Sequence, residues 1–189
     1  MVAALTLVLA ACGGGSGGGN AASGDTDPNG AVSVYGTEPQ NTLIPSNTAE
    51  LGGAKIIEPL FAKLINFKNP GAKPYNVMAE SVTTTDSKVY DIKIKQGWKF
   101  HDGTEVKAHN FVDAWNYGAY APNGQLNSDF YSQIEGYGQV HPEDKNAKPT
   151  TDKMSGLKVL GDYEFQVTLS APFSVFQIKI GYIAFAPLP

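Results

Sequence analysis

An alternating segment followed closely by a helical pattern constrains the fold of this chain most. In residues 89–95 (VYDIKIK) polar and apolar side chains alternate, with a tyrosine and two isoleucines on one face. Such alternation is typical of an antiparallel strand that is buried on one face only. Residues 101–104 (HDGT) predict a turn, and the apolar side chains of residues 108–119 recur at helical spacing. Together these patterns predict an α+β (mixed α/β) chain with antiparallel strands.

The segment before this block predicts one strand and one helix. Residues 31–37 (AVSVYGT) alternate and are rich in β-branched side chains, which favours a strand. Asn47 and Glu50 have the spacing of a capping box, so we expect a helix to begin there with Asn47 as its N-cap. Because a proline inside a helix removes a backbone hydrogen bond, Pro59 predicts that this helix kinks or ends near Glu58.

The last part of the chain predicts a hairpin, a helix and an extended end. Residues 157–169 contain two strand patterns around Gly161-Asp162, a two-residue turn. Ser170 is placed to cap a helix, whereas the polar, Pro- and Gly-rich residues 122–151 predict a long surface excursion. Residues 183–189 predict an apolar strand without partners. We therefore expect this strand to expose its large apolar side chains and to make the isolated chain unstable.

The N-terminal residues concern location rather than folding. Residues 2–11 (VAALTLVLAA) have the size of a signal-peptide apolar region and are far shorter than the ~20 residues of a membrane-spanning helix. The sequence Leu9-Ala10-Ala11-Cys12 resembles a bacterial lipobox, which implies a lipid on Cys12 and cleavage before it. The run GGGSGGG at residues 13–19 predicts a flexible tether. No positive residue precedes the apolar run, so we expect the chain to begin inside its signal peptide.

Composition excludes several classes of function. The chain has 14 basic and 18 acidic residues, and its formal charge of −4 makes charge-driven nucleic-acid binding unexpected. Its single cysteine excludes an internal disulfide framework and a CxxC-type metal site, and we expect neither a metal nor a cofactor. His101 and Asp102 leave open a surface lipoprotein hydrolase. A turn is the preferred interpretation of these two residues, since no Ser or Cys nucleophile motif accompanies them.

Several segments resemble, in the same order, the extracytoplasmic solute-binding proteins of peptide-type ABC importers (family 5). The strongest is residues 90–115 (YDIKIKQGWKFHDGTEVKAHNFVDAW), which is similar to the family signature of a strand, a Gly, Lys-Phe, Asp-Gly-Thr and a helix. Residues 57–61 (IEPLF), residues 80–81 (ES), and the hairpin at residues 157–169 followed by Pro172-Phe173 also match family segments.

The resemblance implies the N-terminal part of a two-lobe, periplasmic-binding-protein-like fold with an extra N-terminal subdomain, whose second lobe lies outside this chain. The domain organisation implied is a signal-peptide remnant with the lipobox at residues 1–12, a tether at 13–29, the start of lobe one at 30–65, the extra subdomain at 66–151, and a return to lobe one at 152–189.

The resemblance also implies a function. It predicts a monomeric, lipid-anchored protein on the outer face of the bacterial membrane that captures peptides and delivers them to the permease subunits of an ABC importer, without catalysis. The same fold in this family binds nickel complexes, haem or oligosaccharides, and a surface adhesin or signalling receptor is a further alternative. The ligand contacts implied are the backbone of Ala49, Glu50 and Leu51 and, at a looser match, Asn127 and Ser128, although Glu50 has an equal claim as a helix cap.

Overall fold

The structure, a computed structural model, describes residues 30–31 and 33–189. The predicted lipobox with Cys12 and the tether at residues 13–29 lie outside the described residues. Residues 36–189 form one compact unit. The strand predicted at residues 31–37 is wrong, because its described residues pair with no strand and the side chains of Val34 and Tyr35 are 83% and 84% exposed. An alternating pattern makes a strand only where a neighbouring strand offers backbone partners.

A four-stranded antiparallel sheet carries the core. Its strands lie in the order β3 (Ala79–Thr83), β4 (Val89–Ile94), β6 (Glu164–Thr168), β5 (Leu157–Gly161). The predicted strand at residues 89–95 is confirmed as β4, and Tyr90, Ile92 and Ile94 are buried as the alternation required. The predicted C-terminal hairpin is also confirmed, with its turn at residues 162–163, one position later than predicted. A separate hairpin pairs β1 (Ile65–Lys68) with β2 (Lys73–Asn76).

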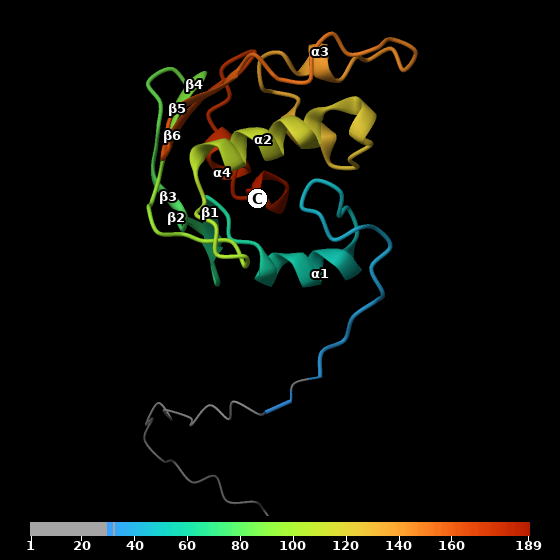
Figure 1. Cartoon of the computed structure of the whole chain (residues 1–189). Helices are drawn as coiled ribbons and strands as arrows, with labels where there is room; N and C mark the ends of the chain where they lie inside the picture. The colour runs from blue at the N-terminus through green and yellow to red at the C-terminus, as the bar shows by residue number, and fades with distance from the viewer. Residues whose placement is uncertain (1–29, 32) are drawn as a thin grey trace, which may run out of the picture. The chain divides into compact units, whose positions relative to one another are not determined.

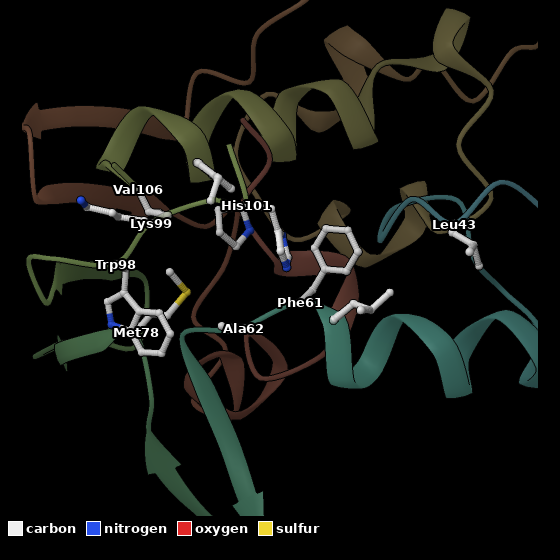
Figure 2. A pocket seen from close by; sticks show the side chains of 11 residues that line it. Leu43, Phe61, Ala62, Met78, Trp98, Lys99, His101 and Val106 are labelled. Carbon is white, nitrogen blue, oxygen red and sulfur yellow. The ribbon is translucent and has the colours of Figure 1, made fainter. Parts of the chain in front are cut away.

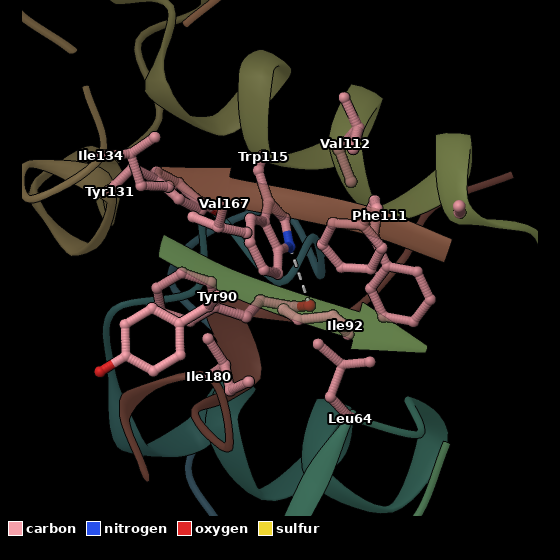
Figure 3. Close-up of a cluster of buried hydrophobic side chains, with 14 of the residues drawn as sticks. Leu64, Tyr90, Ile92, Phe111, Val112, Trp115, Tyr131, Ile134, Val167 and Ile180 are labelled. Carbon is pink, nitrogen blue, oxygen red and sulfur yellow. Dashed lines mark hydrogen bonds between the residues drawn. The ribbon is translucent and has the colours of Figure 1, made fainter. Parts of the chain in front are cut away.

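Helix α2 (Ala108–Ala119) packs against the sheet and matches the predicted helix. Its Trp115 is fully buried, with its ring edge-on to Phe165 of β6 at 5.5 Å between centroids. Figure 3 shows the Trp115 ring pointing from α2 into this core, beside Val167. At the start of the helix the Lys107 N–H donates to Asn110 Oδ1 at 2.8 Å, so the third residue of α2 satisfies the backbone before it.

The C-terminal segment differs from its prediction. The helix predicted from Ser170 is only a four-residue turn, α4 (Phe176–Lys179), and residues 183–185 form a 3₁₀ helix, η3 (Ile183–Phe185), instead of a strand. Phe185 is fully buried rather than exposed. Its ring lies edge-on to those of Trp115 and Tyr131, at 5.0 and 5.2 Å between centroids. The segment is therefore part of the core.

Side chains from other elements donate hydrogen bonds to the backbone carbonyls of this segment. They take the place of the neighbouring strand that the sequence did not provide. The Trp115 indole N–H donates to the carbonyl of Phe185 at 3.0 Å, and the Tyr131 hydroxyl donates to that of Ala184 at 2.5 Å. The Asn110 amide donates to the carbonyl of Leu188 at 3.0 Å. Because these carbonyls are satisfied, the segment can be buried without joining a sheet.

Helix α1 (Leu51–Leu60) lies on the other side of this segment, as Figure 1 shows by the chain end between α1 and α2. Its Ile57 packs with Ile183 and Ala186. The predicted N-cap at Asn47 is wrong: Glu50 is the cap, and its Oε2 accepts the Gly53 N–H at 2.8 Å. A glutamate side chain is long enough to turn back to its own first helical turn. The helix ends one residue after Pro59, close to the predicted end.

Residues 122–151 are held to the fold more firmly than a surface excursion would be. They begin inside η1 (Ala121–Asn123), contain η2 (Ser128–Tyr131) and α3 (Tyr137–Val140), and bury Tyr131, Ile134 and Val140. Strands on both sides of the expected boundary at residues 151/152 form one sheet, so the described chain does not divide there. The division into a lobe and an extra subdomain stays a prediction about the complete protein.

Candidate binding site

Two loops that are distant in sequence are joined through Asn127. Its side-chain Nδ2 donates to the carbonyls of Pro45 at 3.1 Å and Thr48 at 2.8 Å, and its backbone N–H donates to the carbonyl of Ser46 at 2.9 Å. The Ser46 hydroxyl in turn donates to Gln125 Oε1 at 2.9 Å. These bonds hold the loop before α1 against the loop before η2, although some 80 residues of chain separate the two.

A concavity of about 460 Å³ opens beside this junction. It brings together four of the five residues that the sequence assigned to ligand contact, namely Ala49, Glu50, Leu51 and Asn127. Ser128 is buried next to Asn127 and does not line the concavity. The remaining lining residues are Thr48, Ala54, Glu58, Phe130, Tyr182 and Ile183.

Part of the backbone that lines this concavity is free to bind. Neither the N–H nor the C=O of Ala49, nor the N–H of Leu51, has a hydrogen-bond partner among the described residues. Glu50 is already engaged, since its two carboxylate oxygens accept from the N–H groups of Gly53 and Gln40. Glu50 therefore acts as a cap for α1, and the backbone on either side of it offers the unpaired groups.

Six lining residues were missed by sequence reasoning, and three of them, Glu58, Phe130 and Tyr182, bring a carboxylate and two aromatic rings to the site. The rings of Phe130 and Tyr182 are stacked, with centroids 4.4 Å apart and planes 19° apart, and Tyr182 stays 52% exposed. Tyr182 follows α4 and reaches this site only because the C-terminal segment folds back toward α1. No local pattern in the sequence signals that approach.

A second concavity, of about 410 Å³, lies near the C-terminal end of α1. It is lined mainly by apolar side chains, and Figure 2 shows Phe61, Met78 and Trp98 around it together with His101. Trp98 is thus only partly buried and packs at the edge of the core, unlike Trp115.

His101 and Asp102 do not form the pair that a hydrolase would need. The Asp102 carboxylate accepts from both the N–H and the hydroxyl of Thr104, at 2.9 and 2.7 Å. These hydrogen bonds lower the pKa of Asp102. Among the described residues no hydrogen bond joins Asp102 to His101, so the carboxylate closes the turn, as the sequence predicted.

Metal-ligand clusters and membrane-spanning helices are both absent from the described part of the chain. It contains no group of three His, Cys, Asp or Glu side chains placed to hold a metal ion. None of its helices combines the length and the hydropathy needed to cross a bilayer.

Comparison with protein families and sequences gives consistent matches. The family model described as "Bacterial extracellular solute-binding proteins, family 5 Middle" matches residues 73–189. The periplasmic oligopeptide-binding protein OppA of Salmonella typhimurium is 33% identical over 112 residues, which are 59% of this chain and 20% of that protein. The oligopeptide-binding protein OppA of Bacillus subtilis is 27% identical over 186 residues, 97% of this chain and 33% of that protein. The chain thus spans a fifth to a third of the curated relatives that it matches.

Solved structures share the fold. Haemophilus influenzae OppA, in complex with the peptide RPPGFSPFR, has a TM-score of 0.72 and 25% identity over 82% of this chain and 29% of that one. The Escherichia coli murein tripeptide binding protein MppA has a TM-score of 0.72 and 22% identity over 82% of this chain and 30% of that one. Both matches cover the mixed helix and sheet unit described above.

Proposed function

The chain belongs to the bacterial extracellular solute-binding proteins of family 5, and on this premise we propose that the complete protein captures peptides outside the cytoplasm and delivers them to an ABC importer. In this proposal the protein binds without catalysis, and two lobes close over the solute. The relatives named as oligopeptide-binding proteins support a peptide as the solute. A lipid on Cys12 would hold the protein at the outer face of the membrane.

The single observation that carries the proposal is the unpaired backbone at Ala49 and Leu51 beside the Asn127 junction. An extended peptide has an N–H and a C=O at almost every residue, whatever its side chains are. Free backbone donors and acceptors in a concave wall can therefore bind many peptides through main-chain hydrogen bonds. The hydrogen bonds of Asn127 to Pro45 and Thr48 hold this backbone in place before a ligand arrives, which lowers the entropy cost of binding.

Isothermal calorimetry on the full-length protein with di- to pentapeptides tests the proposal. We expect binding in the wild-type protein and weaker binding in Asn127→Ala, with little change in the matched variant Asn123→Ala, whose amide bonds to Tyr117 away from the concavity. Circular dichroism checks that both variants fold. If no peptide of any length binds, the protein takes a different solute and the peptide proposal is rejected.

Location and import are tested separately. Cys12→Ser should release the protein from the membrane fraction, because no lipid can be attached to serine through a thioether. Deleting the protein should abolish the uptake of a peptide that it binds. Normal uptake without the protein would favour a receptor or adhesin role that keeps the binding fold.

A further inference from the structure

We propose that the concavity beside Asn127 selects peptides that present a cationic group, with Glu58 as the residue that determines this specificity. The proposal rests on the proposed peptide-binding function and names the class of peptide that this part of the site prefers. It depends on four features of the lining: its charge, the fixing of Glu58, the orientation of the Asn127 amide, and an aromatic stack.

The charged residues that line the concavity are both acidic. Glu50 and Glu58 contribute carboxylates, and no lysine is among the lining residues. The oxygens of Glu50 are taken by backbone N–H groups. Glu58 binds through Oε2 only, so its Oε1 has no partner among the described residues, and its side chain is 48% exposed. Glu58 is therefore the carboxylate that a ligand can reach.

Glu58 is fixed in place from behind by a buried lysine. The Nζ of Lys63 lies 2.7 Å from Glu58 Oε2, and the Lys63 side chain is only 6% exposed. Lys63 does not line the concavity. A buried ammonium needs a partner carboxylate, so Lys63 holds one oxygen of Glu58, while the second oxygen has no partner among the described residues.

The Asn127 amide adds a second acceptor. Asn127 is only 7% exposed, yet it lines the concavity. Its Nδ2 donates both hydrogens inward, to two backbone carbonyls, which fixes the orientation of the amide. No described group donates to its Oδ1. No described side-chain oxygen or nitrogen is both buried and unpaired, so this oxygen is open to solvent and can accept a donor from the ligand.

An aromatic surface completes the lining. The stacked rings of Phe130 and Tyr182 share the concavity with Glu58. The Lys179 ammonium already lies 5.7 Å from the centroid of the Phe130 ring, so the half-exposed Tyr182 is the ring that a ligand cation would meet. Aromatic rings attract cations, and carboxylate and amide oxygens accept hydrogen bonds from them. An ammonium has three donors and a guanidinium has five, with no acceptor on either. A lining of acceptors and aromatic carbon therefore complements such a group better than a neutral or anionic one.

Two parts of a peptide supply this chemistry: a Lys or Arg side chain, and the amino-terminal ammonium. Calorimetry on the full-length protein distinguishes them. One set of tetrapeptides carries lysine at each position in turn, beside the same peptides with norleucine, which has a side chain of similar length and no charge. A second set compares a neutral tetrapeptide with its N-acetylated form.

The variant is Glu58→Gln combined with Lys63→Met, because the single glutamate change would leave the buried lysine without its anion. Lys63→Met alone is the matched control, since it keeps the carboxylate. In the wild-type protein we expect a preference of about tenfold for the cation, either for lysine over norleucine at one position or for the free over the acetylated terminus. This ratio should shrink as salt is raised.

We expect the double variant to lose this ratio. Lys63→Met keeps the carboxylate but removes the group that holds it, so this control should retain a preference for the cation that is smaller than in the wild-type protein. Loss of the lysine preference would identify a side chain as the cation, and loss of the terminal preference would identify the amino terminus. Tight binding with no preference for a cation, or a preference that survives in the double variant, overturns the inference and leaves the proposed function standing. Failure of every peptide to bind overturns the proposed function instead.

Discussion

Replacing Phe185 by alanine should remove much of the stability of the described unit. The side chain is fully buried and its ring contacts those of Trp115, Tyr131, Phe130 and Phe176, with centroids 5.0 to 6.3 Å away. The lost burial alone is worth about 1.5–3 kcal/mol, and the cavity left behind brings the usual cost of a buried Phe→Ala change to about 3–5 kcal/mol. Because four aromatic contacts disappear together, we expect a value near the upper end, about 4–5 kcal/mol.

Urea unfolding followed by tryptophan fluorescence measures this cost, since Trp115 lies against Phe185 and reports its surroundings directly. The matched control is Ile178→Ala in neighbouring α4, where the side chain is 43% exposed and the expected change is below about 1 kcal/mol. If Phe185→Ala cost no more than this control, the C-terminal segment would be the exposed strand that the sequence predicted, and the packing argument would be refuted.

Three further changes test separate parts of the structure. Tyr131→Phe should cost about 1–3 kcal/mol in urea unfolding because a buried carbonyl loses its donor. Burial raises the pKa of Tyr131 above the ordinary 10.0. The contribution of Tyr131 to stability is therefore present below about pH 10 and is lost as the pH rises and the tyrosine of the unfolded state ionises. The phenylalanine variant should lack this part of the loss of stability at alkaline pH. Asn127→Asp should cost about 2–4 kcal/mol and weaken peptide binding, because a carboxylate would face two backbone carbonyls. In Gly156→Ala the new Cβ would lie 2.3 Å from a backbone oxygen of β6, so thermal unfolding should show a loss of about 1–3 kcal/mol, whereas Gly138→Ala has open space and should show little change.

Local pattern predicted the elements whose cause is local. The alternation at residues 89–95 identified β4 because one face of that strand is buried in the core while the other face is at least partly exposed. The apolar stripe of residues 108–119 identified α2 for the same reason. The family resemblance, carried by the strand, turn and helix between residues 90 and 115, is confirmed by the family match.

Predictions failed where a partner distant in sequence decides the structure. Residues 183–189 have the composition of a strand, but donors from Trp115, Tyr131 and Asn110 take up its carbonyls and make a buried 3₁₀ turn possible. Conversely, residues 31–37 alternate like a strand, and their described residues form no strand.

The residues of the candidate site also fall into two groups, those predicted from the sequence and those that only the structure shows. The resemblance pointed to Ala49, Glu50, Leu51, Asn127 and Ser128, and the structure places all of them except Ser128 on one concavity. Glu58 and Tyr182 were missed because the sequence does not show which face of α1 meets the returning C-terminal segment.

The sequence by itself determined the α+β class, the central strand and helix, the turn at His101 and Asp102, and the family. The first three follow from the chemistry of residues close together along the chain, whereas the family followed from the resemblance of several segments to known members. Only the tertiary structure decided that the C-terminal segment is buried between α1 and α2, that Asn127 joins two loops, and that Glu58 keeps one oxygen free. The physical reason is that buried donors and acceptors must be paired, and their partners here lie tens of residues away.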